Sequence, residues 1–568
     1  MVKDIEGCRK MGQRRYFIGL LIVLVIALIA RSLLLISGAV SFHSDEAIVA
    51  LMARHITLGE RPVFFYGQAY MGSLDAWVLA LGFQLFGESV NTIRLMQSIL
   101  FIGVVATAYH AAWVLSRRIA VAVGSGLLFA IGPVLLALYT TATLGGYNET
   151  LIFGHLIIAM GYGLTHNLKP SAISHQRSAS PASPPITNHQ PPITFLWLLL
   201  GIITGLAWWT NALIVIYVVP VALFMLVQIL RSPSRRMWIL VGVALIGFFI
   251  GSAPWWLYAL QNEWGPLRFL LPTGLRGDNV GAELQEIPFT DRLIGLLLFG
   301  LPSLLGLRFP WEAAFFLPVI GLVVLGIVLI GFYRLARARN TLLQPGALWI
   351  LLGMIALMIA VFLFTRFSSD PSGRYFLPLT LPLVIAVSSL TVATSTAQTR
   401  SYLARYAGLA AVGLTLLYFA AGQIVAARGP YGLTTQFNTE THLPAADDVA
   451  LIDWLLTNDL RYGYTNYWIN FRIAFLSREQ IQLSAALPDK SNMLYTPVFD
   501  RYPPYRQASD SAERVAYITA LIPEIDAAME SWLAAEAITY QTQQIGIYRV
   551  YYGFAPRVPR PPVPFARQ

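Results

Sequence analysis

The chain has 568 residues, of which 56% are hydrophobic and 12% are charged. Soluble domains are about 45–50% apolar even when glycine is counted, so this composition excludes a soluble globular protein for the chain as a whole. The formal net charge of +10 comes largely from arginines in short segments between apolar runs, which indicates membrane topology rather than nucleic-acid binding.

Apolar runs of about 20 residues recur along the chain, and each is long enough to cross a bilayer core of roughly 30 Å. The basic segment 1–16 precedes the first run, so the positive-inside rule places it in the cytoplasm. We interpret the first run as a membrane helix rather than a removed signal peptide, because it is long and lacks a small-residue cleavage site. The runs predict an all-α membrane part over 17–425 with eleven crossings, at about 17–40, 92–115, 119–140, 149–164, two short helices within 194–230, 237–257, 313–333, 346–366, 375–393 and 406–425.

Two apolar segments are predicted not to span the membrane. Residues 73–87 lie in the first outer loop, 41–91, and are too few for a crossing. Residues 293–307, in the outer loop 258–312, are interrupted by a proline, and a crossing there would put the basic end of the next helix on the wrong side. We expect both segments to be re-entrant or interfacial.

The remaining segments are polar or mixed. Residues 165–193 are rich in Ser, Pro and His and predict a disordered cytoplasmic linker. Residues 426–553 predict a soluble α/β domain outside the membrane, with a helix at 449–460 and a strand at 543–552. The proline-rich tail 554–568 is predicted to be disordered.

The first outer loop carries the strongest candidate site, because Asp45 and Glu46 stand together just after the first membrane helix. One interpretation is a helix start, with Ser44 as the N-cap and the two acids in the first turn, where they suit the helix dipole. The other is catalysis, in which Asp45 is a general base and Glu46 orients the acceptor or supports Asp45. The two interpretations are compatible, since a carboxylate at a helix start can also accept a proton.

Basic and aromatic residues around these acids are candidates for binding a phosphate or a substrate. The loop itself contributes Arg61, Tyr66 and Gln68. Arg31 lies about nine residues before the end of the first helix, which at 1.5 Å per residue is a depth of roughly 13 Å. An unpaired arginine at that depth costs about 2.5–3.5 kcal/mol or more, so we expect it to bind an acid of this chain or a lipid phosphate.

Two later outer turns add further candidates. The turn GGYNET (145–150) presents Tyr147 and Glu149, where Glu149 is either a second acid of the site or a charge at a helix start. The turn SSDPSGRYFLP (368–378) presents Arg374 and Tyr375. A guanidinium there can hold a phosphate in a forked geometry, although an Arg–Tyr pair is also an ordinary interfacial anchor.

Five motifs together resemble polyprenyl-phosphate-dependent glycosyltransferases of the GT-C superfamily. In order along the chain they are SDEA, YGQAYMGSLDAWVLALGFQLFG with Arg94 after it, GGYNET, GLAWWTN and GRYFLP. The resemblance covers about residues 15–395 and points to the family 39 branch, which includes protein O-mannosyltransferases, lipid A aminoarabinose transferases and bacterial RgtA/B/C/D-like proteins. It implies that Asp45 is the catalytic acid, that Glu149 is a second functional acid, and that Arg94 belongs to the substrate site. The chain departs from many relatives at Met71-Gly72-Ser73, where they have a proline pair, so a lysine contact to the phosphate is not carried over.

The resemblance implies transfer of a sugar from a polyprenyl-phosphate donor to a glycan, lipid or protein at the outer face of a cell membrane. A transporter or flippase of lipid-linked saccharides is the alternative, but it would place polar residues at mid-membrane in paired repeats, and the sequence shows no repeat. No spacing of His, Cys, Asp or Glu predicts a metal site, and the single cysteine, Cys8, excludes an intrachain disulfide.

Overall fold

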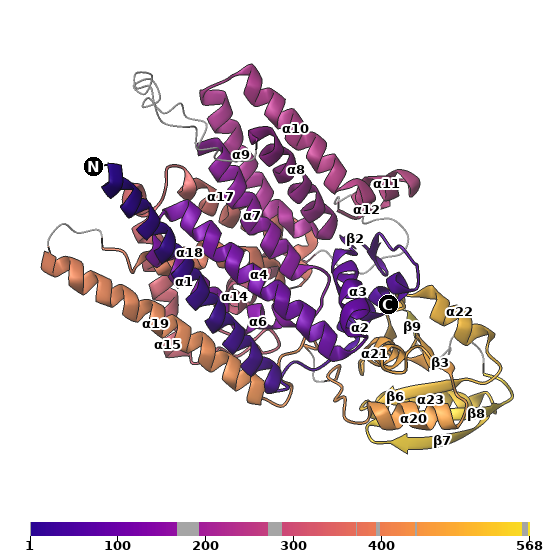
Figure 1. Cartoon of the computed structure of the whole chain (residues 1–568). Helices are drawn as coiled ribbons and strands as arrows, with labels where there is room; N and C mark the ends of the chain where they lie inside the picture. The colour runs from indigo at the N-terminus through magenta and orange to yellow at the C-terminus, as the bar shows by residue number, and fades with distance from the viewer. Residues whose placement is uncertain are drawn as a thin grey trace.

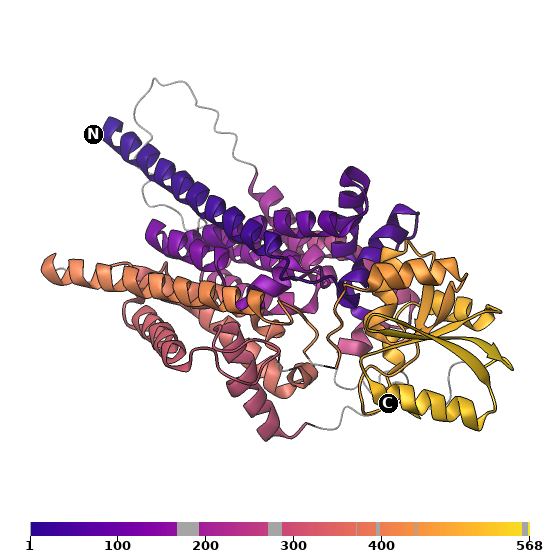
Figure 2. The same cartoon turned by 90° about the horizontal axis from the view of Figure 1, so that it is seen from below.

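The computed structural model describes residues 2–166, 192–270, 287–370, 372–393, 398–437, 440–558 and 566–567. Long helices run side by side in one body, and a smaller domain with a β-sheet lies at one end of it (Figures 1 and 2). The N-terminus lies at the opposite end of the helical body from this domain (Figure 1). The predicted linker 165–193 falls almost entirely outside the described residues, as does most of the tail 554–568.

All eleven predicted membrane runs contain helices. In the described part of the chain, seven helices are long and apolar enough to cross a membrane, and nine spans result if two bent pairs each count as one. The bent pairs are α5 with α6 and α10 with α11, which turn by 71° and 63°. The other two predicted runs correspond to α7 and to α18 with the 3-10 turn η6 (Arg374–Leu379) before it. The helices of the body are α1 (Val2–Ile36), α4 (Val90–Ser116), α5 (Ile119–Ala130), α6 (Val134–Thr141), α7 (Tyr147–His166), α8 (Ile193–Thr210), α9 (Val215–Arg231), α10 (Arg235–Gly251), α11 (Ala253–Gln261), α15 (Pro318–Arg337), α17 (Ala347–Phe364), α18 (Thr380–Ser389) and α19 (Gln398–Arg428).

The predicted break between the two short helices of 194–230 lies at Asn211. This residue is extended, and its side-chain oxygen accepts a hydrogen bond of 3.0 Å from the backbone N–H of Leu213. The predicted non-spanning segment 293–307 is likewise divided, into α13 (Phe289–Ile294), a π-helical turn η4 (Gly295–Gly300) and α14 (Leu301–Leu304). The other short segment forms α3 (Leu74–Phe86), a helix of 13 residues.

Glycines allow α8 and α10 to pack with their backbones in contact. Gly201 and Gly205 on α8 face Gly247 and Gly251 on α10, and a Cβ atom at any of the four would lie within 2.0–2.4 Å of a backbone oxygen of the other helix. Small residues four apart permit this close approach in membranes, where the association of helices depends on packing rather than on the hydrophobic effect. The spacing therefore fixes this pair, which runs parallel, since contacts advance along both helices together.

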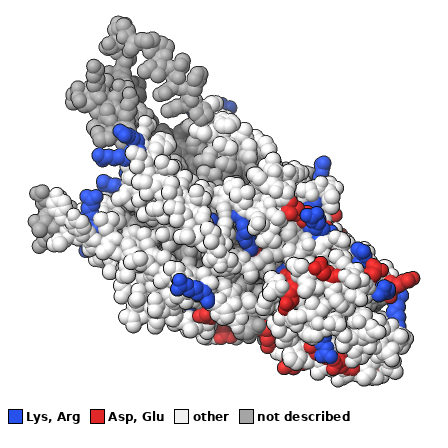
Figure 3. Space-filling view, turned by 60° about the horizontal axis from the view of Figure 1, so that its bottom comes forward, with Lys and Arg blue, Asp and Glu red and all other residues white. Residues whose placement is uncertain are grey.

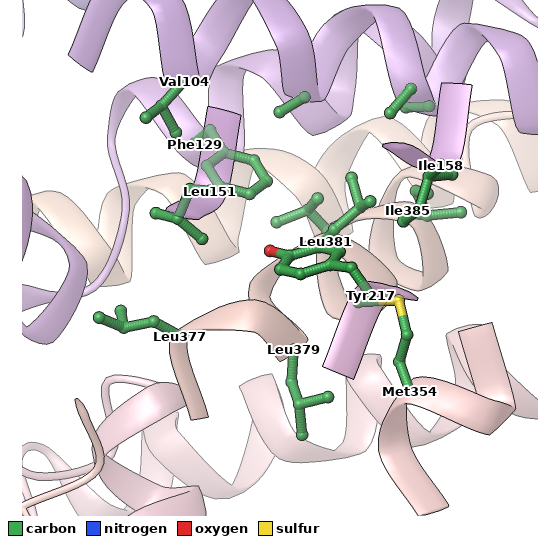
Figure 4. Packing of buried hydrophobic residues seen from close by; sticks show 14 of the residues in the cluster. Val104, Phe129, Leu151, Ile158, Tyr217, Met354, Leu377, Leu379, Leu381 and Ile385 are labelled. Carbon is green, nitrogen blue, oxygen red and sulfur yellow. The ribbon is translucent and has the colours of Figure 1, made fainter. Parts of the chain in front are cut away.

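One apolar cluster runs through the middle of the helical body (Figure 4). Figure 4 shows Tyr217 of α9 among Leu381 of α18, Met354 of α17 and neighbouring aliphatic side chains. Tyr217 and Met354 are fully buried. The outer surface of the same helices is also apolar, as at Val319, whose side chain is 76% exposed, and this is the pattern of a body that lies in lipid.

The first outer loop forms a compact layer at the end of the body nearest the smaller domain (Figure 1). It consists of α2 (Ser44–Thr57), the hairpin β1 (Phe64–Phe65) and β2 (Gln68–Gly72), and α3. Helix α2 is buried along nearly its whole length, because α3 covers one side and a helix of the smaller domain covers another. The N-cap position is His43 rather than Ser44, and no side chain caps the helix.

The smaller domain is the predicted α/β domain. Its five strands are ordered β4-β3-β6-β8-β7, with β3 parallel to β4 and β6, and with β8 antiparallel to β6 and β7. Separate apolar clusters border its two faces. The elements are α20 (Asp448–Thr457), β3 (Tyr462–Thr465), α21 (Tyr467–Leu476), β4 (Gln482–Ala485), α22 (Pro503–Ser511), β6 (Ala516–Ala520), α23 (Pro523–Ala535), β7 (Thr539–Ile545) and β8 (Tyr548–Ala555).

The segment predicted as one strand at 543–552 is instead a hairpin. Gly546 adopts a positive φ of 53°, and Ile545 pairs with Tyr548 across the turn. A glycine adopts this conformation at little cost, so it divides the apolar run into β7 and β8. At the far end of the tail, β9 (Ala566–Arg567) pairs with β5 (Leu494–Tyr495).

Charge follows the division between the two parts. In Figure 3 the acidic side chains gather toward the end that carries the smaller domain, while much of the helical body shows no charge on this face. Basic side chains also lie at the opposite end of the body (Figure 3). This distribution is that of a multi-pass membrane body with a polar domain at one end.

Candidate active site

A cavity of about 290 Å³ lies where the first outer loop, the helical body and the smaller domain meet. Five of the predicted site residues line it, although they come from four different segments. They are Asp45 of α2, Gln68 of β2, Tyr147 of α7, and Arg374 and Tyr375 of η6. The sequence thus identified a set of residues that the fold brings to one place.

Asp45 is held by two hydroxyl groups from beyond the last membrane helix. Tyr467 donates a hydrogen bond of 2.6 Å to Oδ1, and Thr435 donates one of 2.8 Å to Oδ2. Burial raises the pKa of Asp45, but the nearby His43 and Arg501 and these two hydrogen bonds outweigh it, and the pKa is lowered overall. Asp45 is therefore an oriented carboxylate at the wall of the cavity, and its lowered pKa favours the ionised form.

Arg374 and Tyr375 form a second polar group in the same cavity. The Nε of Arg374 lies 2.6 Å from Oδ2 of Asp370, and its Nη2 donates a hydrogen bond of 3.0 Å to the hydroxyl of Tyr375. The ring of Tyr147 belongs to the same wall and packs edge-on against Tyr139. The arrangement presents one guanidinium and several phenol groups to whatever occupies the cavity.

Glu46 does not line the cavity but forms a buried ion pair with Arg94 of α4. Its side chain is fully buried, and Nη2 of Arg94 donates a hydrogen bond of 2.8 Å to Oε1. Nη1 of Arg94 donates to the other carboxylate oxygen, which also accepts the backbone N–H of Thr143 at 3.1 Å. This ion pair therefore joins α2 to α4. Glu46 follows Asp45 directly in the chain, but neither Glu46 nor Arg94 lines the cavity.

Glu149 is buried in the first turn of α7, and neither carboxylate oxygen has a hydrogen-bond partner among the described residues. It does not line the cavity. Its neighbour Asp75 of α3 is also buried, and it accepts hydrogen bonds from Gln97, from Thr143 and from the backbone of the turn at 145–146. Asp75 thus holds the GGYNET turn, a role that no sequence pattern identified.

The other three predicted residues lie elsewhere. Arg31 is buried in the body, where Nη2 donates a hydrogen bond of 2.7 Å to Thr140 and the guanidinium lies 3.8 Å from the ring centre of Phe101. The expected acidic partner of Arg31 is absent among the described residues. Arg61 is exposed. The hydroxyl of Tyr66 donates to Glu60, and its ring stacks on Tyr502 of the smaller domain, outside the cavity.

The smaller domain contributes residues to the site that no sequence pattern indicated. Phe499 and Arg501 of this domain line the cavity, and Tyr467 donates a hydrogen bond to Asp45. Thr435, in the segment that follows α19, lines the cavity and also donates a hydrogen bond to Asp45. These residues belong to a region with no recognisable motif, so only the fold shows that they meet the first outer loop. In the described part of the chain, no group of three or more His, Cys, Asp or Glu side chains is arranged to hold a metal ion.

The fold is similar to that of ArnT from Cupriavidus metallidurans. The crystal structure of that protein bound to undecaprenyl phosphate aligns with a TM-score of 0.57 at 13% identity, over 94% of this chain and 97% of that chain. Its apo structure gives the same values. No family model matches the sequence, and no curated protein does. The chain therefore has the fold of ArnT, and the fold that the sequence resemblance implied is confirmed.

Proposed function

We propose that this protein is a membrane glycosyltransferase that moves a sugar from a polyprenyl-phosphate donor to an acceptor at the outer face of the membrane. Asp45 is the general base, and the reaction inverts the anomeric carbon. The observation that carries the proposal is the setting of Asp45, which accepts hydrogen bonds from two hydroxyl groups and lines a cavity that also presents Arg374. The fold supports it, because ArnT, which has the same fold, was crystallised with undecaprenyl phosphate.

The chemistry needs one base and one cationic group on different sides of the sugar. Asp45 accepts the proton of the acceptor hydroxyl as its oxygen bonds to the anomeric carbon. The bond between that carbon and the phosphate oxygen breaks, and the polyprenyl phosphate leaves with the electron pair. In this proposal Arg374 and Tyr375 donate hydrogen bonds to the leaving phosphate, and Gln68 and Tyr147 contact the sugar.

Asp45→Asn tests the proposal. The amide keeps the shape of the side chain. Its oxygen can accept a hydrogen bond from one of the two hydroxyls and its NH2 can donate to the other, but it is not a base. A positioned base contributes about 10²–10⁴-fold, so we expect the initial rate of transfer to fall by about two orders of magnitude or more. The substrate is found first, by mass spectrometry of the envelope glycans that a deletion strain loses and the wild-type protein restores.

The control is binding of undecaprenyl phosphate by purified Asp45→Asn protein, which should equal that of the wild type. If the variant binds the lipid and keeps more than about a tenth of wild-type turnover, Asp45 is not the base. That loss of rate would be smaller than removal of a positioned base causes. A deletion strain with unchanged envelope glycans would contradict the proposed function itself.

A further inference from the structure

The cavity contains a second guanidinium, that of Arg501, whose surroundings differ from those of Arg374. Arg374 is neutralised by Asp370. No carboxylate of a described residue lies within ion-pair distance of Arg501, and its buried Nε has no hydrogen-bond partner there. The guanidinium instead lies over two aromatic rings, 4.8 Å from the ring centre of Tyr467 and 5.7 Å from that of Phe65. A cation held in place by aromatic faces keeps its hydrogen-bonding fork available for an anion.

Arg501 lies on the same side of the cavity as the base. The ring of Tyr467 lies under the guanidinium of Arg501, and the hydroxyl of the same ring binds Asp45 at 2.6 Å. Arg374 belongs to a different group, with Asp370 and Tyr375. In an inverting transfer the base and the acceptor lie on one side of the anomeric carbon and the leaving group on the other. The side of Asp45 and Arg501 is therefore the acceptor's side.

We propose that Arg501 binds an oxyanion of the acceptor, a carboxylate or a phosphate, next to the hydroxyl that Asp45 deprotonates. The acceptor is thus an anionic saccharide. This inference rests on the proposed function and adds the chemical class of the acceptor. A guanidinium recognises either oxyanion through two parallel hydrogen bonds. The walls formed by Phe65, Tyr70 and Phe499 offer flat apolar faces and a phenol group, which suit a sugar ring better than an extended peptide.

The test compares two variants of the full-length protein in lipid nanodiscs, Arg501→Met and Arg374→Met. Methionine keeps an unbranched apolar stem that packs on the aromatic rings and lacks the charge. The probes of the acceptor side are methyl glucuronide, methyl glucoside 6-phosphate and neutral methyl glucoside. The probe of the donor side is undecaprenyl phosphate. Arg461→Met is the matched control, because Arg461 is an exposed arginine of the same domain, paired with Asp459.

We expect the wild-type protein to bind at least one charged sugar about tenfold or more tightly than the neutral sugar, the gain typical of a hydrogen bond to a charged group. Arg501→Met should remove that preference and leave the binding of undecaprenyl phosphate unchanged. Arg374→Met should weaken the binding of undecaprenyl phosphate and leave the preference for the charged sugar unchanged. Arg461→Met should change neither. The charged sugar that is preferred identifies the oxyanion as a carboxylate or a phosphate.

Several results would overturn the inference. These are a preference that survives in Arg501→Met, equal or undetectable binding of all three sugars by the wild type, or tighter binding of an acidic serine peptide than of either charged sugar. Loss of undecaprenyl phosphate binding in Arg501→Met would move Arg501 to the donor's side. Failure of the wild type to bind undecaprenyl phosphate would instead contradict the proposed function. If Arg501→Met does not fold, Arg501→Lys, which keeps the charge without the fork, should lose part of the preference.

Discussion

The chemistry at the scale of single residues depends on which groups surround one carboxylate. Asp45 starts a helix, but the groups that orient it are hydroxyls of Tyr467 and Thr435 rather than a cap. Thr435 also lies 3.2 Å from Nε2 of His43. Each hydrogen bond to the charged form favours ionisation, so Asp45 stays ready to accept a proton although it is partly buried.

Tyr467→Phe should move the acid limb of the pH–rate profile to higher pH. Loss of the hydroxyl removes one interaction that lowers the pKa of Asp45, so the carboxylate is protonated, and the base lost, at a higher pH than in the wild type. The pH dependence of kcat/KM measures this shift. Tyr464→Phe is the control, because the hydroxyl of Tyr464 binds Asp510 in the same domain. An unshifted acid limb in folded Tyr467→Phe would show that this hydroxyl does not tune Asp45.

At the scale of elements, α2 is joined to both of its neighbours by charged groups. The Glu46–Arg94 pair joins it to α4 in the helical body. At its other end, Arg54 and His55 both contact Glu479 of the smaller domain, His55 at 2.9 Å. Burial raises the pKa of Glu479, but hydrogen bonds from His55 and Tyr505 and the nearby charges lower it to about 2. Helix α2, which carries Asp45, is thus held between the helical body and the smaller domain.

Glu46→Gln should destabilise the protein without abolishing its chemistry. The change leaves Arg94 buried without a counter-charge, which typically costs about 3–5 kcal/mol. We expect a clearly lower Tm, while the turnover of the folded fraction stays within a few-fold of the wild type. Glu88→Gln is the matched control, since Glu88 is 27% exposed and its partner Arg54 keeps Glu479. If folded Glu46→Gln protein instead lost turnover about a hundredfold, as expected for loss of a catalytic base, Glu46 would have a catalytic role.

At the scale of the whole molecule, the site forms where three parts of the chain meet at one end of the body. The first outer loop provides Asp45, η6 provides Arg374, and the smaller domain provides Arg501. The smaller domain can close this cavity only if it lies on the same side of the membrane as the first outer loop. The arginines between the membrane runs predict that this side is the outer one.

Cysteine labelling tests that orientation. In a Cys8→Ser background, Ser180→Cys marks the predicted inner linker, and Glu513→Cys marks an exposed position of the smaller domain. A membrane-impermeant thiol reagent applied to intact cells should label Glu513→Cys only, and both positions should react after the cells are opened. Labelling of Ser180→Cys but not Glu513→Cys in intact cells would reverse the topology.

The apolar helices and the position of Asp45, the proposed base, could be predicted from the sequence alone. A helix in lipid must be apolar over its own length, so each of the eleven runs is legible without knowledge of its neighbours. The break at Asn211 could also be predicted from the local sequence. A polar residue that caps the following turn interrupts an apolar run there. Asp45 was identifiable because two adjacent acids directly after a membrane helix are rare in so apolar a chain.

Which of these residues lie together depends on how distant parts of the chain pack. Tyr467 lies 422 positions after Asp45, and Arg94 lies 48 positions after Glu46. Periodicity and composition report on neighbours along the chain, whereas an ion pair or a shared cavity depends on how distant segments pack. For that reason Glu46 and Arg94 were both expected in the substrate site, although they bind each other. For the same reason Arg501 carried no signal until the smaller domain was placed over the first outer loop.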